Sequence, residues 1–126
     1  MQTQIMPGIR IGPVFFDGGG APVFDYGTTH IAHAQMTNPT PAAFTYNAEL
    51  YLGPGKVATS GSVPFTLSAG QSKVVDFAIT MPDVEGTWPV LLDVFVGVDL
   101  IAAYQATEDV SVVITPDIDI GPITWD

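Results

Sequence analysis

The sequence predicts an all-β protein built as an antiparallel sandwich of two sheets, and three observations support this. Apolar and polar residues alternate with a period of two along several segments, which is the side-chain spacing of a half-buried strand. Clusters of Gly, Pro, Asn and Asp separate these segments, as expected for turns. No window shows the helical period of 3.6 residues. A chain of 126 residues suits one such domain.

A long hairpin in residues 87–114 is predicted to organise the sheet. The apolar residues that share one face of its first strand are Trp88, Val90, Leu92, Val94 and Val96. A turn at 97–99 reverses the chain, and residues 100–106 return beside the first strand. The apolar face continues past a polar break at 108–109 with Val110, Val112 and Ile114. We expect so long and apolar a hairpin to lie in the middle of its sheet.

The first predicted strand, residues 9–16, contains a Gly-Pro step at positions 12 and 13. Proline cannot donate a hydrogen bond to a neighbouring strand, so this segment is expected at a sheet edge or at a bulge. Its apolar side chains are Ile9 and Ile11 before the step and Val14 and Phe16 after it. Residues 1–8 are predicted to form an N-terminal arm.

Four more strands are predicted before the hairpin. Residues 28–36 present a small inward face, and residues 44–52 show the clearest alternation in the chain. Residues 63–67 and 72–81 are predicted to pair as a hairpin across the turn at 68–70. The total is about seven strands, which predicts an immunoglobulin-like antiparallel β-sandwich over residues 9–115, with extended N- and C-terminal strand segments.

Several runs of sequence resemble a known kind of module. They are Asn38 at the end of the second strand, FTYNAELYL, LSAGQSKVVDFAITMP and EGTWPVLLDV. On these runs, residues 38–113 resemble the Ig-like and fibronectin-III-like modules of bacterial and archaeal surface proteins and phage structural proteins, of the kind called CARDB. The resemblance implies a fold with Trp88 at the start of a core strand. It does not imply one function, because such modules serve adhesion, spacing and virion decoration.

Composition restricts the partners. The net charge is −10 and the cations are Arg10, Lys56 and Lys73, too few to follow a phosphate backbone, so no nucleic acid is expected. No apolar run reaches 18 residues, so no membrane span is expected. Charged residues make up 13% of the chain, against a usual value of roughly 25%. Such a surface is either rich in Thr, Ser and Gly or buried against other chains, and we favour burial in an assembly.

Candidate chemistry in the sequence is weak. Without cysteine there are no disulfides, thiolate metal sites or cysteine nucleophiles. His30 and His33 are three apart in a predicted strand and therefore point to opposite faces. Acidic pairs at 83/85, 108/109 and 117/119 suggest a calcium site, but no EF-hand spacing accompanies them. No serine lies in a nucleophile motif. We expect no enzyme activity, no cofactor and no metal.

The two ends of the chain carry one repeated motif. Residues 9–17, IRIGPVFFD, align with residues 118–126, IDIGPITWD, with five of nine positions identical at an offset of 109 residues. Residues 116–126, here called the tail, have several readings that remain open. They are an ordinary edge strand of the same sandwich, a strand that adds to a neighbouring copy, the first strand of a lost tandem repeat, or a pairing of both ends within one subunit.

Together these features predict a non-enzymatic structural subunit that self-assembles into or decorates a larger particle. Its partners would be further copies of itself or another structural protein, in a capsid-decorating or tail protein of a virion or in an extracellular filament. No signal peptide is visible. The predicted assembly residues are Ile9, Ile11, Val14, Phe16, Ile118, Ile120, Ile123 and Trp125. The alternative is a carbohydrate-binding or adhesion module with a glycan partner, for which Tyr51 is the clearest exposed aromatic.

Overall fold

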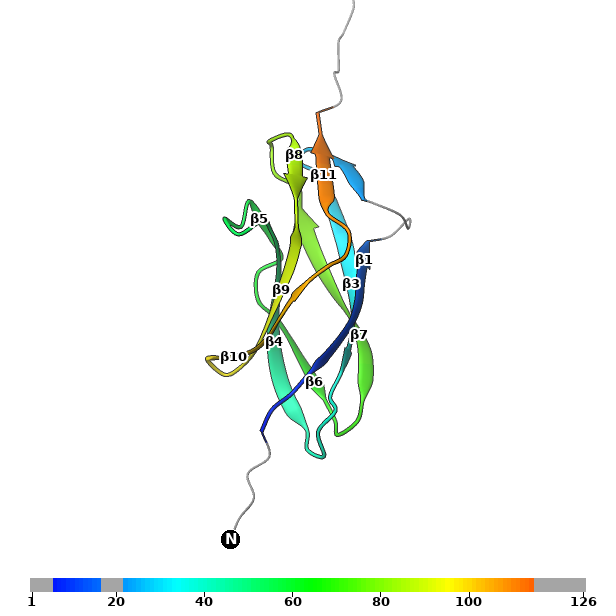
Figure 1. The fold of residues 1–126 in the computed structure, drawn as a ribbon, viewed down its shortest axis with the longest axis vertical. Helices are drawn as coiled ribbons and strands as arrows, with labels where there is room; N and C mark the ends of the chain where they lie inside the picture. The colour runs from blue at the N-terminus through cyan, green and yellow to red at the C-terminus, as the bar shows by residue number, and fades with distance from the viewer. Residues whose placement is uncertain (1–5, 17–21, 115–126) are drawn as a thin grey trace, which may run out of the picture.

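Two layers of antiparallel strands face each other in the computed structural model, which describes residues 6–16 and 22–114 (Figure 1). The strands are β1 (Arg10–Phe16), β2 (Val23–Asp25), β3 (Thr29–Thr37), β4 (Phe44–Leu52), β5 (Ala58–Thr59), β6 (Val63–Leu67), β7 (Ser72–Thr80), β8 (Gly86–Trp88), β9 (Val90–Val96), β10 (Asp99–Gln105) and β11 (Val110–Val113). One layer has the order β1-β3-β7 and the other β10-β9-β4, with β5 and β6 both paired to β4. A third small sheet, β2-β11-β8, continues one end of the molecule. The predicted all-β sandwich is confirmed.

The predicted count of about seven strands agrees with these eleven segments because several strands are interrupted. β5 and β6 pair with successive parts of β4 and behave as one bulged strand. β8 and β9 are separated by Pro89 alone, which has no N–H to continue a ladder. β10 and β11 are separated by residues 106–109. Among the described residues there is no helix long and apolar enough to cross a membrane.

The long hairpin is present and carries a two-residue insertion. Leu91 pairs with Gln105, and Trp88 pairs with Val110. The three residue steps from 88 to 91 therefore lie opposite the five steps from 105 to 110. Because two extra residues preserve the alternation of faces, Val110 and Val112 remain buried. Two expectations were wrong. β10 lies at the edge of its sheet, since β4 takes the other side of β9, and Ile114 is 45% exposed beyond the last strand.

The core lies where the predicted inward faces of the two layers meet. Fully buried residues come from alternate positions of β3, β4, β7 and β9. They are Ala32, Ala34 and Met36; Tyr46, Ala48, Leu50 and Leu52; Phe77 and Ile79; and Val90, Leu92 and Val94. The small alanines of β3 lie in the same layer as the large Phe77, which pairs with Ala32. This alternation of size fills the space between the layers.

The predicted hairpin of residues 63–67 and 72–81 is wrong. β6 pairs with β4, whereas β7 pairs with β3 in the opposite layer. The short turn between them therefore crosses the sandwich. Each of the two strands thus pairs with an earlier strand of the chain instead of with the other. β2 was also unpredicted; it pairs in parallel with β11 and belongs to a different sheet from β1.

Asn38 fixes one end of the sandwich. Its side chain is fully buried, and its Nδ2 donates to the carbonyl oxygens of Ala42 (2.7 Å), Leu67 (3.2 Å) and Ser68 (3.2 Å). Its Oδ1 accepts from the backbone N–H of Thr40 at 2.9 Å and from its hydroxyl at 2.7 Å. One amide thus joins the β3–β4 and β6–β7 turns, which explains why asparagine ends the second strand.

Trp88 fixes the other end by packing between two glycines. A Cβ at Gly53 would lie 2.9 Å from Cδ1 of the indole, and a Cβ at Gly86 would lie 3.0 Å from Cη2. Gly53 also has a φ of +67°, a left-handed conformation that favours glycine. Its N–H donates to the carbonyl of Pro89 at 2.9 Å, at the step where the chain passes from β8 to β9.

Candidate functional site

β1 is an edge strand with an interrupted ladder, as predicted. It pairs antiparallel with β3, and the register shifts between Ile11 and Val14, at the Gly-Pro step. Within the described residues, no strand pairs with its other edge. A Cβ at Gly12 would lie 3.1 Å from Cβ of Gln35, so glycine allows the two strands to approach there. The repeated motif keeps both residues of this step.

The apolar side chains of β1 pack into the chain's own core. Phe16 is 6% exposed, and its ring meets the edge of the Phe24 ring at a centroid distance of 5.2 Å. Ile9, Ile11 and Val14 are partly buried against the same core. These four predicted assembly residues therefore form one continuous strip of contact within the subunit. We call the surface that β1 covers, formed by β3 and the residues facing it across the layers, the β1 site.

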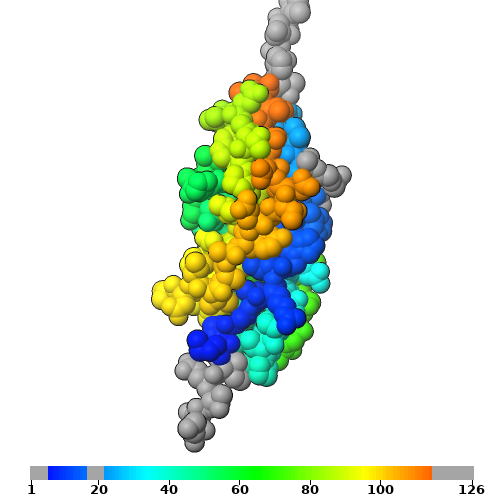
Figure 2. Space-filling view, viewed as in Figure 1, coloured from blue at the N-terminus to red at the C-terminus, as the bar shows by residue number. Residues whose placement is uncertain are grey.

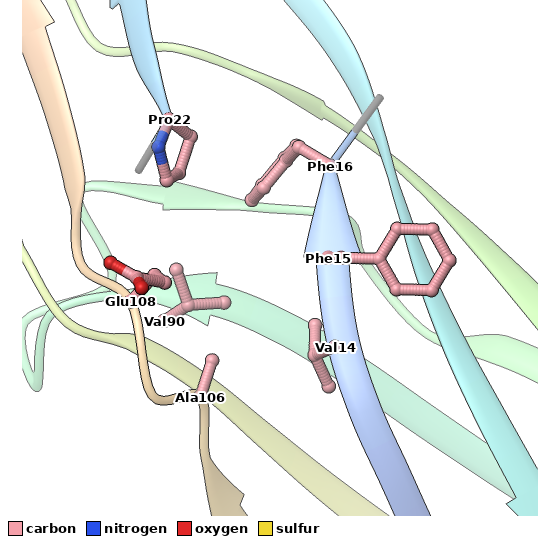
Figure 3. A pocket seen from close by; sticks show the side chains of 7 residues that line it. All are labelled: Val14, Phe15, Phe16, Pro22, Val90, Ala106 and Glu108. Carbon is pink, nitrogen blue, oxygen red and sulfur yellow. The ribbon is translucent and has the colours of Figure 1, made fainter. Parts of the chain in front are cut away.

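The β1 site is incompletely filled. A small cavity of about 40 Å³ lies between β1 and the segment that joins β10 to β11. Its lining residues are Val14, Phe15, Phe16, Pro22, Val90, Ala106 and Glu108. Val14 and Phe16 point from β1 towards this space, while the ring of Phe15 points away (Figure 3). β1 adjoins the β10–β11 segment at the molecular surface as well (Figure 2).

The other predicted assembly residues, Ile118, Ile120, Ile123 and Trp125, lie outside the described residues. Strand exchange by the tail therefore stays a prediction. The fold does place the two attachment points. β1 begins towards one end of the long axis, and β11 ends at the opposite end (Figure 1). The polypeptide therefore leaves the sandwich far from where it begins.

A second hollow lies on the outer face of the other layer. It has a volume of about 210 Å³ and is lined by Tyr51, Leu91, Asp93, Ala103, Tyr104 and Gln105. The Tyr51 hydroxyl donates to Oδ2 of Asp93 at 3.1 Å, and Nζ of Lys56 lies 4.8 Å from the centroid of the Tyr51 ring. Partial burial, and then the neighbouring Asp93, raise the pKa of Tyr51. Sequence reasoning found Tyr51 but missed this hollow, because its residues come from three strands.

Glu49 and Lys56 form an ion pair beside this hollow. Lys56 Nζ lies 2.8 Å from Glu49 Oε1, and the hydroxyl of Thr59 donates to the other carboxylate oxygen. The hydrogen bond from Lys56 and then that from Thr59 lower the pKa of Glu49. The pair holds the Lys56 ammonium near the Tyr51 ring.

The remaining aromatic residues do not line up on one surface. Tyr46 is fully buried, and its hydroxyl donates to the carbonyl of Gly8 at 2.8 Å, with burial raising its pKa. Trp88 is partly buried between its two glycines. Tyr26 is 46% exposed at the β2–β3 turn. A flat row of exposed rings, as many sugar-binding modules use, is therefore not formed by these residues.

The two histidines point to opposite faces of β3, as predicted. His30 stacks on Phe24 with a centroid distance of 3.7 Å on the inward side. Nδ1 of His33 lies 2.6 Å from Oδ1 of Asp76 on the outward side, with the Phe15 ring 5.4 Å away. No group of three or more His, Asp or Glu side chains that could hold a metal occurs in residues 6–16 and 22–114.

Comparison with known proteins shows the class of fold, a β-sandwich module. No family model matches the sequence, and no curated protein matches it. Among solved structures, the chain resembles the CARDB domain of the PF1109 protein from Pyrococcus furiosus, crystallised with di-metal ions. The TM-score is 0.62 at 17% identity, covering 90% of this chain and 100% of that one. The solution structure of that domain gives a TM-score of 0.57 at 20% identity, with coverages of 87% and 100%.

A similar module occurs within a much larger enzyme. The chain matches part of the β-glucosidase EmGH1 from Erythrobacter marinus with a TM-score of 0.58 at 14% identity, covering 85% of this chain but 16% of the enzyme. At these identities the likeness concerns the fold alone. The fold is a CARDB-type, immunoglobulin-like β-sandwich, in agreement with the resemblance read from residues 38–113.

Proposed function

We propose that this protein is a non-enzymatic structural module that joins to further copies of itself end to end through its tail. One observation carries the proposal: the motif that forms the edge strand β1 is repeated at residues 118–126, after β11 in the sequence. The sequence thus holds two versions of one strand. In the proposal, the second version pairs with a neighbouring sandwich.

The shape of the module supports the same proposal. Because β1 begins towards one end of the long axis and β11 ends at the other, a connection through the tail repeats along that axis (Figure 1). Each copy then contacts the next copy through its own tail and is contacted by the tail of the previous copy. Such a contact is heterologous and generates an open string or filament, or a ring where the rotation closes.

The surface is suited to contacts that are not governed by charge. Cross-strand hydroxyl pairs occupy the outer faces, including Thr29–Thr80 at 2.8 Å, Thr37–Ser72 at 2.7 Å and Thr45–Thr66 at 3.0 Å. Exposed apolar residues on the β1-β3-β7 layer include Phe15, Ile31 and Val74. A surface of this kind favours burial in an extracellular or virion assembly. The forms that we propose are a filament subunit and a capsid-decorating or tail component of a virion.

The test is the solution mass by light scattering, for the intact chain and for a chain that ends at Thr115. We expect the intact chain to form a species larger than a monomer whose mass rises with protein concentration. The shortened chain should be a monomer with unchanged circular dichroism. A monomeric intact chain at all concentrations would overturn the proposal.

A second candidate, carbohydrate binding, is favoured by the hollow at Tyr51. An aromatic ring, the Asp93 carboxylate and the Gln105 amide surround it, and these are groups that bind sugar hydroxyls and ring faces. A glycan array with the intact chain tests this candidate, with Asp93→Asn as the matched variant. Binding that Asp93→Asn abolishes would favour the carbohydrate role, and an array without binding would eliminate it.

A further inference from the structure

We propose that the tail of one copy occupies the β1 site of the next copy, replacing the β1 strand already there. This inference rests on the proposed end-to-end function and names the surface that receives the tail. The repeated motif fixes the correspondence. Ile118, Ile120, Ile123 and Trp125 take the positions of Ile9, Ile11, Val14 and Phe16.

The backbone requirements of the site are met by the tail. β1 needs a glycine where it passes Gln35 and tolerates a proline at the following position, where the register shifts. The tail has Gly121 and Pro122 at the same two places. Its apolar residues then fall on the same face as those of β1, on both sides of the step.

The cavity explains how the tail differs from β1. Two inward positions carry larger residues in the tail: isoleucine replaces valine at the position of Val14, and tryptophan replaces phenylalanine at that of Phe16. Val14 and Phe16 are the residues that point into the unfilled space of about 40 Å³ (Figure 3). In the proposal, the extra methylene and the larger indole ring enter this space, which is lined mostly by apolar residues together with Glu108.

The outward positions also tolerate the exchange. Arg10 is exposed and corresponds to Asp119, and Phe15 is 51% exposed and corresponds to Thr124. At the inward positions the tail therefore carries larger apolar groups than β1, and the two strands differ in polarity only at positions that face solvent. This is the pattern expected for two strands that fit one site.

The direction of β1 agrees with an end-to-end contact. β1 runs from the end of the sandwich where the chain enters towards the end where β11 finishes (Figure 1). A copy placed beyond the end of β11 therefore presents its β1 site in the direction in which the tail continues. Four residues, 114–117, separate β11 from Ile118, and extended chain spans at most about 14 Å over that length.

Disulfide trapping tests the inference directly, because the chain has no cysteine of its own. β1 pairs Phe15 with His33, so a tail in the β1 site brings Thr124 opposite His33. Full-length Thr124→Cys is mixed with full-length His33→Cys and oxidised, and the disulfide heterodimer is measured on a non-reducing gel. Thr66→Cys, exposed on the opposite layer, is the matched control acceptor.

A third acceptor, Phe15→Cys, distinguishes replacement of β1 from addition beside it. A strand added outside β1 would lie about 10 Å from β3, two strand spacings away, beyond the roughly 7 Å that a disulfide allows between Cα atoms. We expect several-fold more heterodimer with His33→Cys than with Thr66→Cys or Phe15→Cys. Preferential trapping by Phe15→Cys, or equal trapping by all three acceptors, would overturn the inference.

A variant of β1 with larger inward side chains provides a second measurement. Val14→Ile together with Phe16→Trp gives β1 the inward residues of the tail, and we expect it to reduce the assembled fraction several-fold in light scattering. Val98→Ile, at a residue 94% exposed, is the control. If truncation at Thr115 abolishes assembly while the trapping and this double variant have no effect, end-to-end assembly stands and the β1 site is wrong. A monomeric intact chain overturns both.

Discussion

β3 is paired on both sides, and its two partners differ. On one side β7 pairs along the whole strand, from Thr29 with Thr80 to Thr37 with Ser72, without a shift in register. On the other side β1 pairs in two short parts separated by the Gly-Pro step. The β7 side buries Phe77 completely, whereas the β1 side leaves a cavity beside Phe16.

The proposal of tail exchange requires that β7 is the permanent partner of β3 and that β1 is the replaceable one. A continuous ladder with large buried side chains must break as a unit. An interrupted edge strand can separate with the loss of fewer hydrogen bonds. The following predictions test this difference, beginning with the largest expected effect.

Removing the main side chain of β7 should have the largest effect. We expect Phe77→Ala to lower the free energy of unfolding by about 3–5 kcal/mol, because a fully buried ring leaves a cavity between the layers. Urea denaturation followed by fluorescence measures this. Val74→Ala, on the outward face of the same strand at 52% exposure, is the control and should change stability little. A loss at Phe77 no larger than at Val74 would contradict the permanent role of β7.

Asn38 should rank second, because it extends the β3–β7 pairing. Its backbone N–H donates to the carbonyl of Gln71 at 2.9 Å, just beyond the last ladder pair. Asn38→Leu keeps a similar shape but removes the side-chain donor to the carbonyl oxygens of Leu67 and Ser68, while that of Ala42 keeps the Thr40 hydroxyl. We expect a loss of about 2–3 kcal/mol in the free energy of unfolding. The same urea titration measures it, with Asn47→Leu on the outward side of β4 as control. A neutral Asn38→Leu would show that water replaces these bonds.

On the β1 side, Phe16→Ala should cost less than Phe77→Ala. We expect the free energy of unfolding to fall by about 2 kcal/mol, less than the roughly 3–5 kcal/mol usual for this substitution. The reason is that Phe16 lies on an interrupted edge strand beside an existing cavity. Hydrogen exchange should show that the amides of β1 lose protection while those of β7 keep it. Equal loss of protection in both strands would mean that they form one cooperative unit.

Filling the cavity should have the smallest effect and the opposite sign. Val14→Ile with Phe16→Trp is expected to stabilise the shortened chain ending at Thr115 by about 1 kcal/mol, from about 24 cal/mol per Å³ over a cavity of about 40 Å³. Calorimetry should show Tm higher by about 3–5 °C. A lower Tm would mean that the cavity cannot accept the larger side chains. It would also count against the proposal that the tail occupies the β1 site.

Much of the fold followed from local pattern. The alternation in β3, β4 and β7 identified their buried faces correctly, because a sheet with one face in the core requires a period of two. The Gly-Pro step identified β1 as an interrupted edge strand, because proline has no N–H to donate. For the candidate site, the sequence supplied the repeated motif and the four apolar positions of β1.

The partners of strands followed only from tertiary structure. A short turn between β6 and β7 predicts a hairpin, but the two strands lie in opposite layers, where β6 pairs with β4 and β7 pairs with β3. The cavity beside Val14 and Phe16 could not be predicted either, since Val90 of β9 and Ala106 of the β10–β11 segment are distant from β1 in sequence. The sequence by itself determined which side of each strand is apolar, because that depends on neighbouring residues alone. Which strands meet, and where space is left between them, depends on the packing of the whole sandwich, and the tertiary structure decided it.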